Sequence, residues 1–501
     1  MLLMSHTKVV YVNQTLKATI DNPYKEMLLQ CIILNTYPLP TMLSNKDFII
    51  LLLLIAVSGL SLRLIHYQAI PPFTETADEM IYPWYGMSLI KTGTPTSWSN
   101  FRTYRSSQKV IFWGEKYRLV SPYLDKPPLY PIITGSIILA AGIDNFPEVR
   151  LSILRLIPIT LSLLSIILTG LLARSLFGKS VGLLSAILYA TIPTIVLSNR
   201  LSLTENLLTP IALFAIYLFI RQEKTNTGAS TAIILGALSG LAMLTKQIGL
   251  VLPLVISGIF LTQNKWKLAA LVCSISFLVF SVYPLMITYY GWGFFLELMK
   301  EFSSYHTKGL PEITYTILRL PLIGHSGGSF PDGAILAGYI LLFSSPFWLF
   351  KKSHSLKQLL NLKLFLGFPI LYVVILGLME SGHRSSYFFG WHVYPLFPFL
   401  AILLAKTMLD LWRKPLLLKA LIYFLVIGFS TIGFLLKLLP RYQHLWQIIL
   451  ALPLIIISLS FLHNRTSQRT ILTINLTLFI TMNILVVLFA PYFYSNQLQP
   501  S

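Results

Sequence analysis

The stretch Thr74–Gly93, TETADEMIYPWYGMSLIKTG, decides how the chain is interpreted, because it places the carboxylates Asp78 and Glu79 shortly after a long apolar run. A carboxylate beside a lipid bilayer is unfavourable unless it lies in a wet pocket or has a partner, so it marks a candidate functional site. The same pair also fits the start of a short interfacial helix, with Asp78 as the N-cap and Glu79 in the first turn. Position alone leaves both interpretations open.

The composition around this stretch is that of a polytopic membrane protein. Of the 501 residues, 55% are hydrophobic and 11% are charged, whereas a soluble domain carries about 25% charged residues. The net charge of +20 comes from basic residues in small groups between apolar runs. This pattern indicates the positive-inside rule and contact with anionic lipids, and it argues against nucleic acid as a partner. The two cysteines lie far apart, so neither a disulfide framework nor a cysteine metal site is predicted.

The apolar run at 129–143 determines the topology of everything that follows. It is short and starts after two prolines, so we expect a surface or re-entrant helix in place of a span. The remaining short connections then alternate between a side rich in Lys and Arg and a side with few, and the rich side is placed in the cytoplasm. We therefore predict an all-α polytopic protein of the plasma membrane with about 13 transmembrane helices.

The predicted organisation has three parts. Residues 1–47 form a cytoplasmic leader, and a membrane domain follows at 48–410 with a first span from about 48 to 67. This domain has external segments at 68–150 and 291–332. Further transmembrane helices occupy 411–501.

Ionisable side chains from several external segments meet on one face in this topology. The candidate site residues are Asp78, Glu79, Tyr82, Lys126, Arg200, Glu205, Lys246, His383 and Arg384. Lysine and arginine can hold a phosphate, and a carboxylate can accept the proton of an attacking hydroxyl. The set suits a substrate with an anionic head and a lipid tail, together with a hydroxyl-bearing acceptor.

Several of these residues also have purely structural interpretations. Lys246 at a helix end could reach toward the interface as a snorkelling lysine. Arg200 and Glu205 could pair with each other, and Arg384 could lie in a solvated loop. The histidines lack metal-site spacing, so no metal ligand is assigned, although acidic external turns could share a divalent metal.

Three motifs give the chain a family resemblance. DEMIYPWYGMSLIKTG at 78–93 and DKPPLY at 125–130 resemble the first-loop Asp-Glu-x-x-Tyr and Lys-Pro-Pro-Leu motifs of the GT-C membrane glycosyltransferases. RLIPITLSLLSIILTGLLARSLFG at 155–178 and RLSLTENLLT at 200–209 resemble the next helices of that family, with Glu205 where some members have Asp. LSGLAMLTKQIGLVLPL at 238–254 and WHVYPLFPFLAILLA at 391–405 are looser matches. The group includes protein O-mannosyltransferases and lipid A aminoarabinose transferases.

The resemblance implies inverting transfer of a sugar, hexose or pentose, from a polyprenyl-phosphate donor to a protein, lipid or cell-envelope glycan on the outer face. It implies Asp78 as the general base or its organiser, Glu79 as a neighbour that orients or binds, and Lys126, Lys246 and Arg384 as candidate ligands of the donor phosphate. The alternative is a transporter or flippase of a lipid-linked or anionic substrate. Charged residues deep in the spans and inverted repeats would favour a transporter. Here the ionisable residues lie at helix ends.

Overall fold

The computed structural model describes residues 43–73, 76–105, 107–112, 114–222, 228–305, 332–352, 355–379, 390–414 and 465–494. Within them, six helical segments are long and apolar enough to cross a membrane. They are α3 (Asn45–Leu64), α6 with α7 (Leu151–Leu154 and Leu156–Phe177), α13 with α14 (Trp266–Phe280 and Val282–Tyr290), α18 (Leu356–Met379), η6 with α19 (Gly390–Leu396 and Phe397–Arg413) and α22 (Arg465–Leu488). The helical membrane class is confirmed, and the count of 13 spans stays a prediction.

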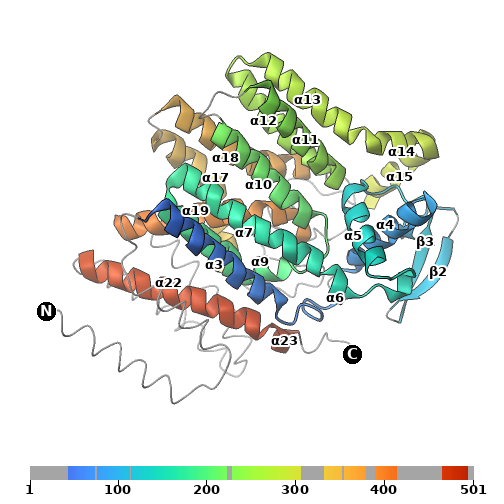
Figure 1. The fold of residues 1–501 in the computed structure, drawn as a ribbon, viewed down its shortest axis with the longest axis horizontal. Coiled ribbons are helices and arrows are strands. Elements are labelled where there is room, and N and C mark those ends of the chain that lie inside the picture. The colour runs from blue at the N-terminus through green and yellow to red at the C-terminus, as the bar shows by residue number, and fades with distance from the viewer. Residues whose placement is uncertain are drawn as a thin grey trace.

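Shorter apolar helices complete the bundle (Figure 1). They are α5 (Leu129–Ala140), α8 (Lys179–Thr191), α11 (Ala229–Thr245), η4 with α12 (Gln247–Leu250 and Val251–Thr262) and α17 (Gly333–Leu349). The other described helices are α9 (Pro193–Ser198), α10 (Glu205–Gln222), α15 (Trp292–Tyr305) and α23 (Ala490–Phe493), with short 3-10 turns η3 (Phe146–Glu148) and η5 (Phe350–Lys352). Of the predicted leader, residues 1–42 lie outside the described residues.

The first span begins at Asn45 because Ser44 and Asp47 form a capping box. The Asp47 amide donates to the Ser44 hydroxyl at 3.1 Å, and the Ser44 amide donates to the Asp47 carboxylate at 3.2 Å. These two bonds satisfy amides that have no partner inside the helix. The predicted start at 48 was therefore late by three residues. The first turn is polar, so a prediction from the apolar run alone leaves it out.

Basic residues gather where α3 begins and α7 ends. The Arg174 guanidinium donates to the Asn45 side chain at 2.8 Å, and Lys179 Nζ donates to the carbonyl of Leu43. The opposite end of α3 carries Arg63, which donates to Asn199 Oδ1 at 2.8 Å. The Lys/Arg-rich end of the bundle is thus separated by the full length of α3 from the end that receives the first long connection.

That connection folds into a compact unit at the right-hand end of α3 and α7 in Figure 1. It contains the 3-10 helix η2 (Ala77–Met80), α4 (Ile81–Thr92), α5 and a three-stranded antiparallel sheet in the order β1-β3-β2. The strands are β1 (Ser97–Trp98), β2 (Ser107–Phe112) and β3 (Glu115–Val120), with Phe112 opposite Glu115 at the hairpin turn. The sheet was not predicted from the sequence.

Helices α4 and α5 approach closely through two glycines. A Cβ atom on Gly86 would lie 1.8 Å from the carbonyl oxygen of Pro131, and one on Gly135 would lie 2.3 Å from the carbonyl carbon of Gly86. Helix α5 has 12 residues, about 18 Å of helix, which is too short for a hydrocarbon core of about 30 Å. It packs closely on α4 through these two glycines.

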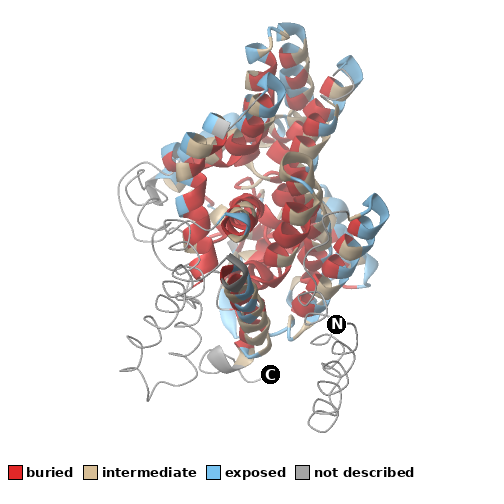
Figure 2. Cartoon of the chain, turned by 90° about the vertical axis from the view of Figure 1, so that its left-hand side faces the viewer, coloured by how far each residue is buried: buried red, intermediate tan, exposed pale blue. Residues whose placement is uncertain are grey.

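Burial divides the spans into central and peripheral ones. Within the apolar window of each span, 94% of the η6–α19 residues are buried against 22% for α13–α14. Figure 2 shows buried residues in the middle of the bundle and exposed residues at its periphery. The central span begins with η6 at residues 390–396. These first turns lie at the end of the bundle that holds the candidate site.

Candidate functional site

The two neighbouring carboxylates of the opening stretch have different environments. Thr76 caps η2, since its hydroxyl accepts a hydrogen bond from the Asp78 amide at 3.1 Å. The interpretation of Asp78 as the N-cap is therefore wrong, and both acids lie in the first turn. Asp78 is half-buried, whereas Glu79 is fully buried.

Glu79 forms a bidentate ion pair with Arg155, which sits at the start of α7. Arg155 donates from Nε to Oε1 at 3.1 Å and from Nη2 to Oε2 at 2.7 Å. The Ser202 amide also donates to Oε1 at 2.9 Å. Both side chains are 0% exposed, so this pair fixes the compact unit that follows α3 to the membrane helices. Arg155 was not among the predicted site residues, although it opens a motif that carried the resemblance.

Arg200 is also buried, and it binds backbone carbonyls. Its guanidinium donates to Ile70 O at 3.1 Å and to Leu62 O at 2.9 Å. The interpretation of Arg200 and Glu205 as partners is wrong, because Glu205 pairs with another residue. The contacts of Arg200 tie the end of α3 to the turn before α10.

Lys246 is the partner of Glu205. It ends α11, where the chain leaves the helix in an extended conformation, and its Nζ donates to Glu205 Oε1. The same Nζ lies 3.2 Å from Nδ1 of His392 in η6. The Lys246 side chain is 13% exposed and that of Glu205 is 1% exposed. Three separate helices therefore converge on one lysine, which a simple snorkelling lysine does not require.

Tyr82 connects this group to Asp78. It is buried on the first turn of α4, and its ring packs edge-on against Tyr130 at 5.2 Å. Burial raises the pKa of the Tyr82 hydroxyl well above its usual value, and the charges of Glu205 and Asp78 raise it further. Both acids therefore act on the same neutral phenol.

The second motif, DKPPLY, lies next to Lys246. The Gln247 amide donates to the carbonyl of Asp125 at 3.4 Å. Burial raises the pKa of the Asp125 carboxyl to about 6, although the Tyr104 hydroxyl donates to it and Lys126 is adjacent. The Lys126 ammonium is half-buried and lies 5.8 Å from the centre of the Phe302 ring on α15. The buried role of Asp125 was not assigned from the sequence.

The predicted residues therefore fall into two groups, apart from His383 and Arg384, which lie outside the described residues. Asp78, Lys126 and Lys246 remain partly accessible, while Glu79, Tyr82, Arg200 and Glu205 are buried. Among the described residues, no group of three or more His, Cys, Asp or Glu side chains could hold a metal ion.

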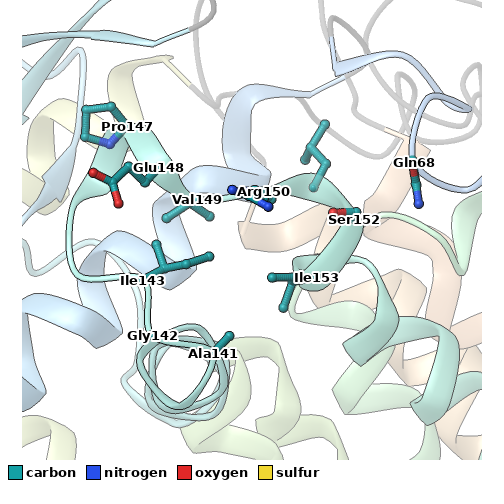
Figure 3. A pocket seen from close by; sticks show the side chains of 11 residues that line it. Gln68, Ala141, Gly142, Ile143, Pro147, Glu148, Val149, Arg150, Ser152 and Ile153 are labelled. Atoms are coloured by element: carbon teal, nitrogen blue, oxygen red, sulfur yellow. The ribbon is translucent and has the colours of Figure 1, made fainter.

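A cavity of about 660 Å³ lies where the end of α5 and η3 meet α6 (Figure 3). Figure 3 shows Glu148 toward one end of it, Gln68 toward the other and Arg150 between them. The Tyr67 hydroxyl donates to the backbone of Ser152 in its wall at 3.0 Å, and the Tyr67 carbonyl accepts from Arg155 at 3.0 Å. The cavity is thus adjacent to the contacts of Arg155, the partner of Glu79. The partly accessible candidates Asp78, Lys126 and Lys246 do not line it.

Comparison with known proteins agrees with this architecture. Residues 125–288 match the family model described as dolichyl-phosphate-mannose-protein mannosyltransferase. The comparison with curated protein sequences gives no match. Among solved structures, ArnT from Cupriavidus metallidurans bound to undecaprenyl phosphate is similar, with a TM-score of 0.54 and 15% identity over 91% of this chain and 78% of ArnT.

Two further structures score below 0.5. The Archaeoglobus fulgidus oligosaccharyltransferase in complex with Zn and sulfate has a TM-score of 0.48 and 14% identity over 76% of this chain and 52% of that one. The S. cerevisiae Pmt1-Pmt2 complex bound to the sugar donor has a TM-score of 0.35 and 19% identity over 52% of this chain and 35% of that one. Of the three, ArnT alone carries the fold comparison. The likeness to ArnT shows the fold, and the match of residues 125–288 to the mannosyltransferase model agrees with the predicted class of GT-C membrane glycosyltransferases.

Proposed function

We propose that the protein transfers a sugar, hexose or pentose, from a polyprenyl-phosphate donor to an acceptor hydroxyl on the outer face of the plasma membrane, with inversion. The observation that carries the proposal is that a partly accessible carboxylate, Asp78, and two partly accessible lysines, Lys126 and Lys246, lie at the same end of the bundle, where Gln247 contacts Asp125. The lysines suit a reaction that releases a phosphate, and the carboxylate can take up the proton that the acceptor hydroxyl loses. ArnT was solved with undecaprenyl phosphate, which supports a donor of this kind.

Asp78 is the general base in this proposal. The acceptor hydroxyl oxygen attacks the anomeric carbon, the bond from that carbon to the phosphate oxygen breaks with its electron pair, and the hydroxyl proton passes to Asp78. A single displacement needs one base and no covalent intermediate, so it inverts the anomeric centre. Glu79 cannot share this role without leaving Arg155 uncompensated, so we assign Glu79 as a positioning residue.

Lys246 and Lys126 bind the donor phosphate. Negative charge grows on the phosphate as the bond breaks. Fixed cations therefore stabilise the transition state more than the ground state. Glu205 and His392 hold Lys246 in place, so its ammonium is oriented before the donor arrives. Glu205 thereby acts as a positioning residue, the Tyr82 hydroxyl responds to the charges of both Glu205 and Asp78, and Arg200 holds the turn before α10. Arg384 stays a prediction as a third phosphate ligand.

The carboxylates of the acidic turns do not fit a shared divalent metal ion. Glu205 already accepts from Lys246, and the ammonium would repel a metal ion bound to the same carboxylate. No step is therefore assigned to a metal. The outer-face assignment is supported by the position of Arg174 and Lys179 at the opposite end of the bundle. A reporter fused after Gly178 should stay inside the cell, and an external reporter would reverse the assignment.

The experiment is a donor panel on purified protein in lipid nanodiscs. Polyprenyl phosphates carrying different labelled hexoses and pentoses are incubated with wild type, and both donor binding and labelled product are measured. We expect one donor class to be turned over and Lys246→Ala to weaken its binding by about tenfold or more. Failure of wild type to bind any polyprenyl phosphate would refute the proposal. Exposed Lys116 on β3 provides a matched Lys→Ala control.

A further inference from the structure

A pocket of about 460 Å³ lies where the compact unit that follows α3 meets α14 and α15. It is formed by both parts of the chain, and the side chains that concern us are Tyr104, Arg105, Ser121, Tyr290, Phe294 and Glu297. Three of them are aromatic, one is a cation, one is an anion and one is a hydroxyl. Its volume is within the range of about 300–1,000 Å³ that is typical of small-molecule sites.

We propose that this pocket binds a sugar ring of the acceptor, so that the acceptor is a glycan. The proposal rests on the proposed function. The apolar C–H face of a pyranose packs against aromatic rings, here Tyr290 and Phe294. Its hydroxyls can donate to the Glu297 carboxylate and accept from the Arg105 guanidinium, since these side chains offer only acceptors and only donors respectively.

The charge balance of the lining favours a neutral saccharide over a phosphate. Arg105 and Glu297 contribute opposite charges to the same pocket, whereas a phosphate site needs an excess of cations. The lysines that meet that need, Lys126 and Lys246, do not line this pocket. The donor phosphate and the acceptor sugar are thereby assigned to different places.

Stacked tyrosines connect the pocket to the candidate site. Tyr104 forms part of the pocket wall, and its hydroxyl donates to Asp125 beside Lys126. Its ring is parallel to that of Tyr123, with centroids 6.4 Å apart and an interplanar angle of 3°. Burial raises the pKa of the Tyr123 hydroxyl well above its usual value, and the charges of Asp125 and Asp78 raise it further. The pocket therefore holds a sugar at a distance from the reacting hydroxyl, and binding there can contribute to transition-state stabilisation elsewhere.

The two walls of the pocket are held together by direct hydrogen bonds. The Tyr290 hydroxyl donates to the carbonyl of Gly93 at 3.1 Å. The carboxylate of Glu301 on α15 accepts from the amides of Arg102 and Thr103, each at 2.7 Å. These contacts preorganise the pocket, so little conformational entropy is lost when a rigid ring binds.

The test measures binding of neutral saccharides to the full chain in nanodiscs. Saturation-transfer NMR is recorded with mannotriose and chitotriose, with a glycolipid that carries the same sugars, and with a Ser/Thr peptide. We expect a trisaccharide or the glycolipid head group to bind, and Glu297→Gln and Arg105→Gln each to weaken that binding by about tenfold. Exposed Glu115 and Lys116 on β3 give matched controls, Glu115→Gln and Lys116→Gln, that should leave binding unchanged.

Each outcome decides the proposal. Binding of the soluble trisaccharide indicates a polymer or oligosaccharide acceptor, and binding of the glycolipid alone indicates a membrane-borne one. Absence of all saccharide binding, binding of the peptide alone, or wild-type binding by both pocket variants would overturn the pocket assignment. Polyprenyl-phosphate binding is measured on the same samples. If it is retained, the failure concerns the acceptor pocket, and if it is also absent, the proposed function itself fails.

Discussion

Replacing Glu79 with glutamine removes the negative charge that faces the Arg155 guanidinium and keeps the shape of the side chain. The Oε1 position can still accept from Arg155 Nε and from the Ser202 amide, which lie at 3.1 and 2.9 Å. The Oε2 position becomes an NH₂ group that faces the Nη2 donor, now 2.7 Å away. Removing one partner of a buried ion pair costs about 3–5 kcal/mol. Arg155 keeps its bonds to Tyr67 O and Pro71 O, so we expect about 3 kcal/mol.

The assay compares the apparent melting temperature and the transfer rate of the detergent-solubilised protein. Glu79→Gln should lower the melting temperature and reduce transfer in proportion to the folded fraction, while Glu115→Gln on exposed β3 should change neither. The double variant Glu79→Met with Arg155→Met should recover part of the stability that Arg155→Met alone loses, because no buried charge is left unpaired. If Glu79→Gln melts like wild type but transfers no sugar, Glu79 takes part in the chemistry and the positioning role is refuted.

Three further substitutions test other parts of the site. Gly135→Ala places a Cβ 2.3 Å from the carbonyl carbon of Gly86, so it should lower the melting temperature by the equivalent of about 1–3 kcal/mol or more, whereas Gly258→Ala, with open space at its Cβ, should not. Burial raises the pKa of Asp125 from 3.8 to about 6, so its contribution to stability is present below about pH 4 and is lost as the pH rises to about 6. Asp125→Asn should therefore flatten the pH dependence of melting in that window, and an unchanged slope would contradict the assigned burial effect. Lys246→Met leaves Glu205 buried without its cation, so it should reduce both donor affinity and melting temperature, and wild-type values in donor titrations would rule out the phosphate role.

The helical class follows from local features of the sequence. Apolar runs of membrane length predict helices, and the distribution of Lys and Arg separates their two ends, as the contacts of Arg174 at the far end of α7 illustrate. The short run at 129–143 forms the 12-residue helix α5, and its assignment as a surface or re-entrant helix stays a prediction. Motif order placed Asp78 and Lys126 in the same long connection after the first span, and the fold brings both into the compact unit that follows α3.

The partners of the charged residues could not be predicted, because they depend on contacts between distant segments. Glu79 and Arg155 are 76 positions apart, and Lys246 lies 146 positions from His392. A single sequence gives the charge of each residue but not which opposite charge it meets. The three-stranded sheet was missed for a related reason, since its strands are short and flanked by aromatic residues that also suit an interfacial loop.

The central claim, that Asp78 takes the proton of the acceptor, is tested most directly by single-turnover transfer with Asp78→Asn. Donor binding is measured on the same nanodisc samples, so loss of the base is separated from loss of the site. General-base catalysis contributes about 10²–10⁴-fold, and we predict a fall of that size in the transfer rate with unchanged polyprenyl-phosphate affinity and melting temperature. Transfer by Asp78→Asn at the wild-type rate would contradict the mechanism.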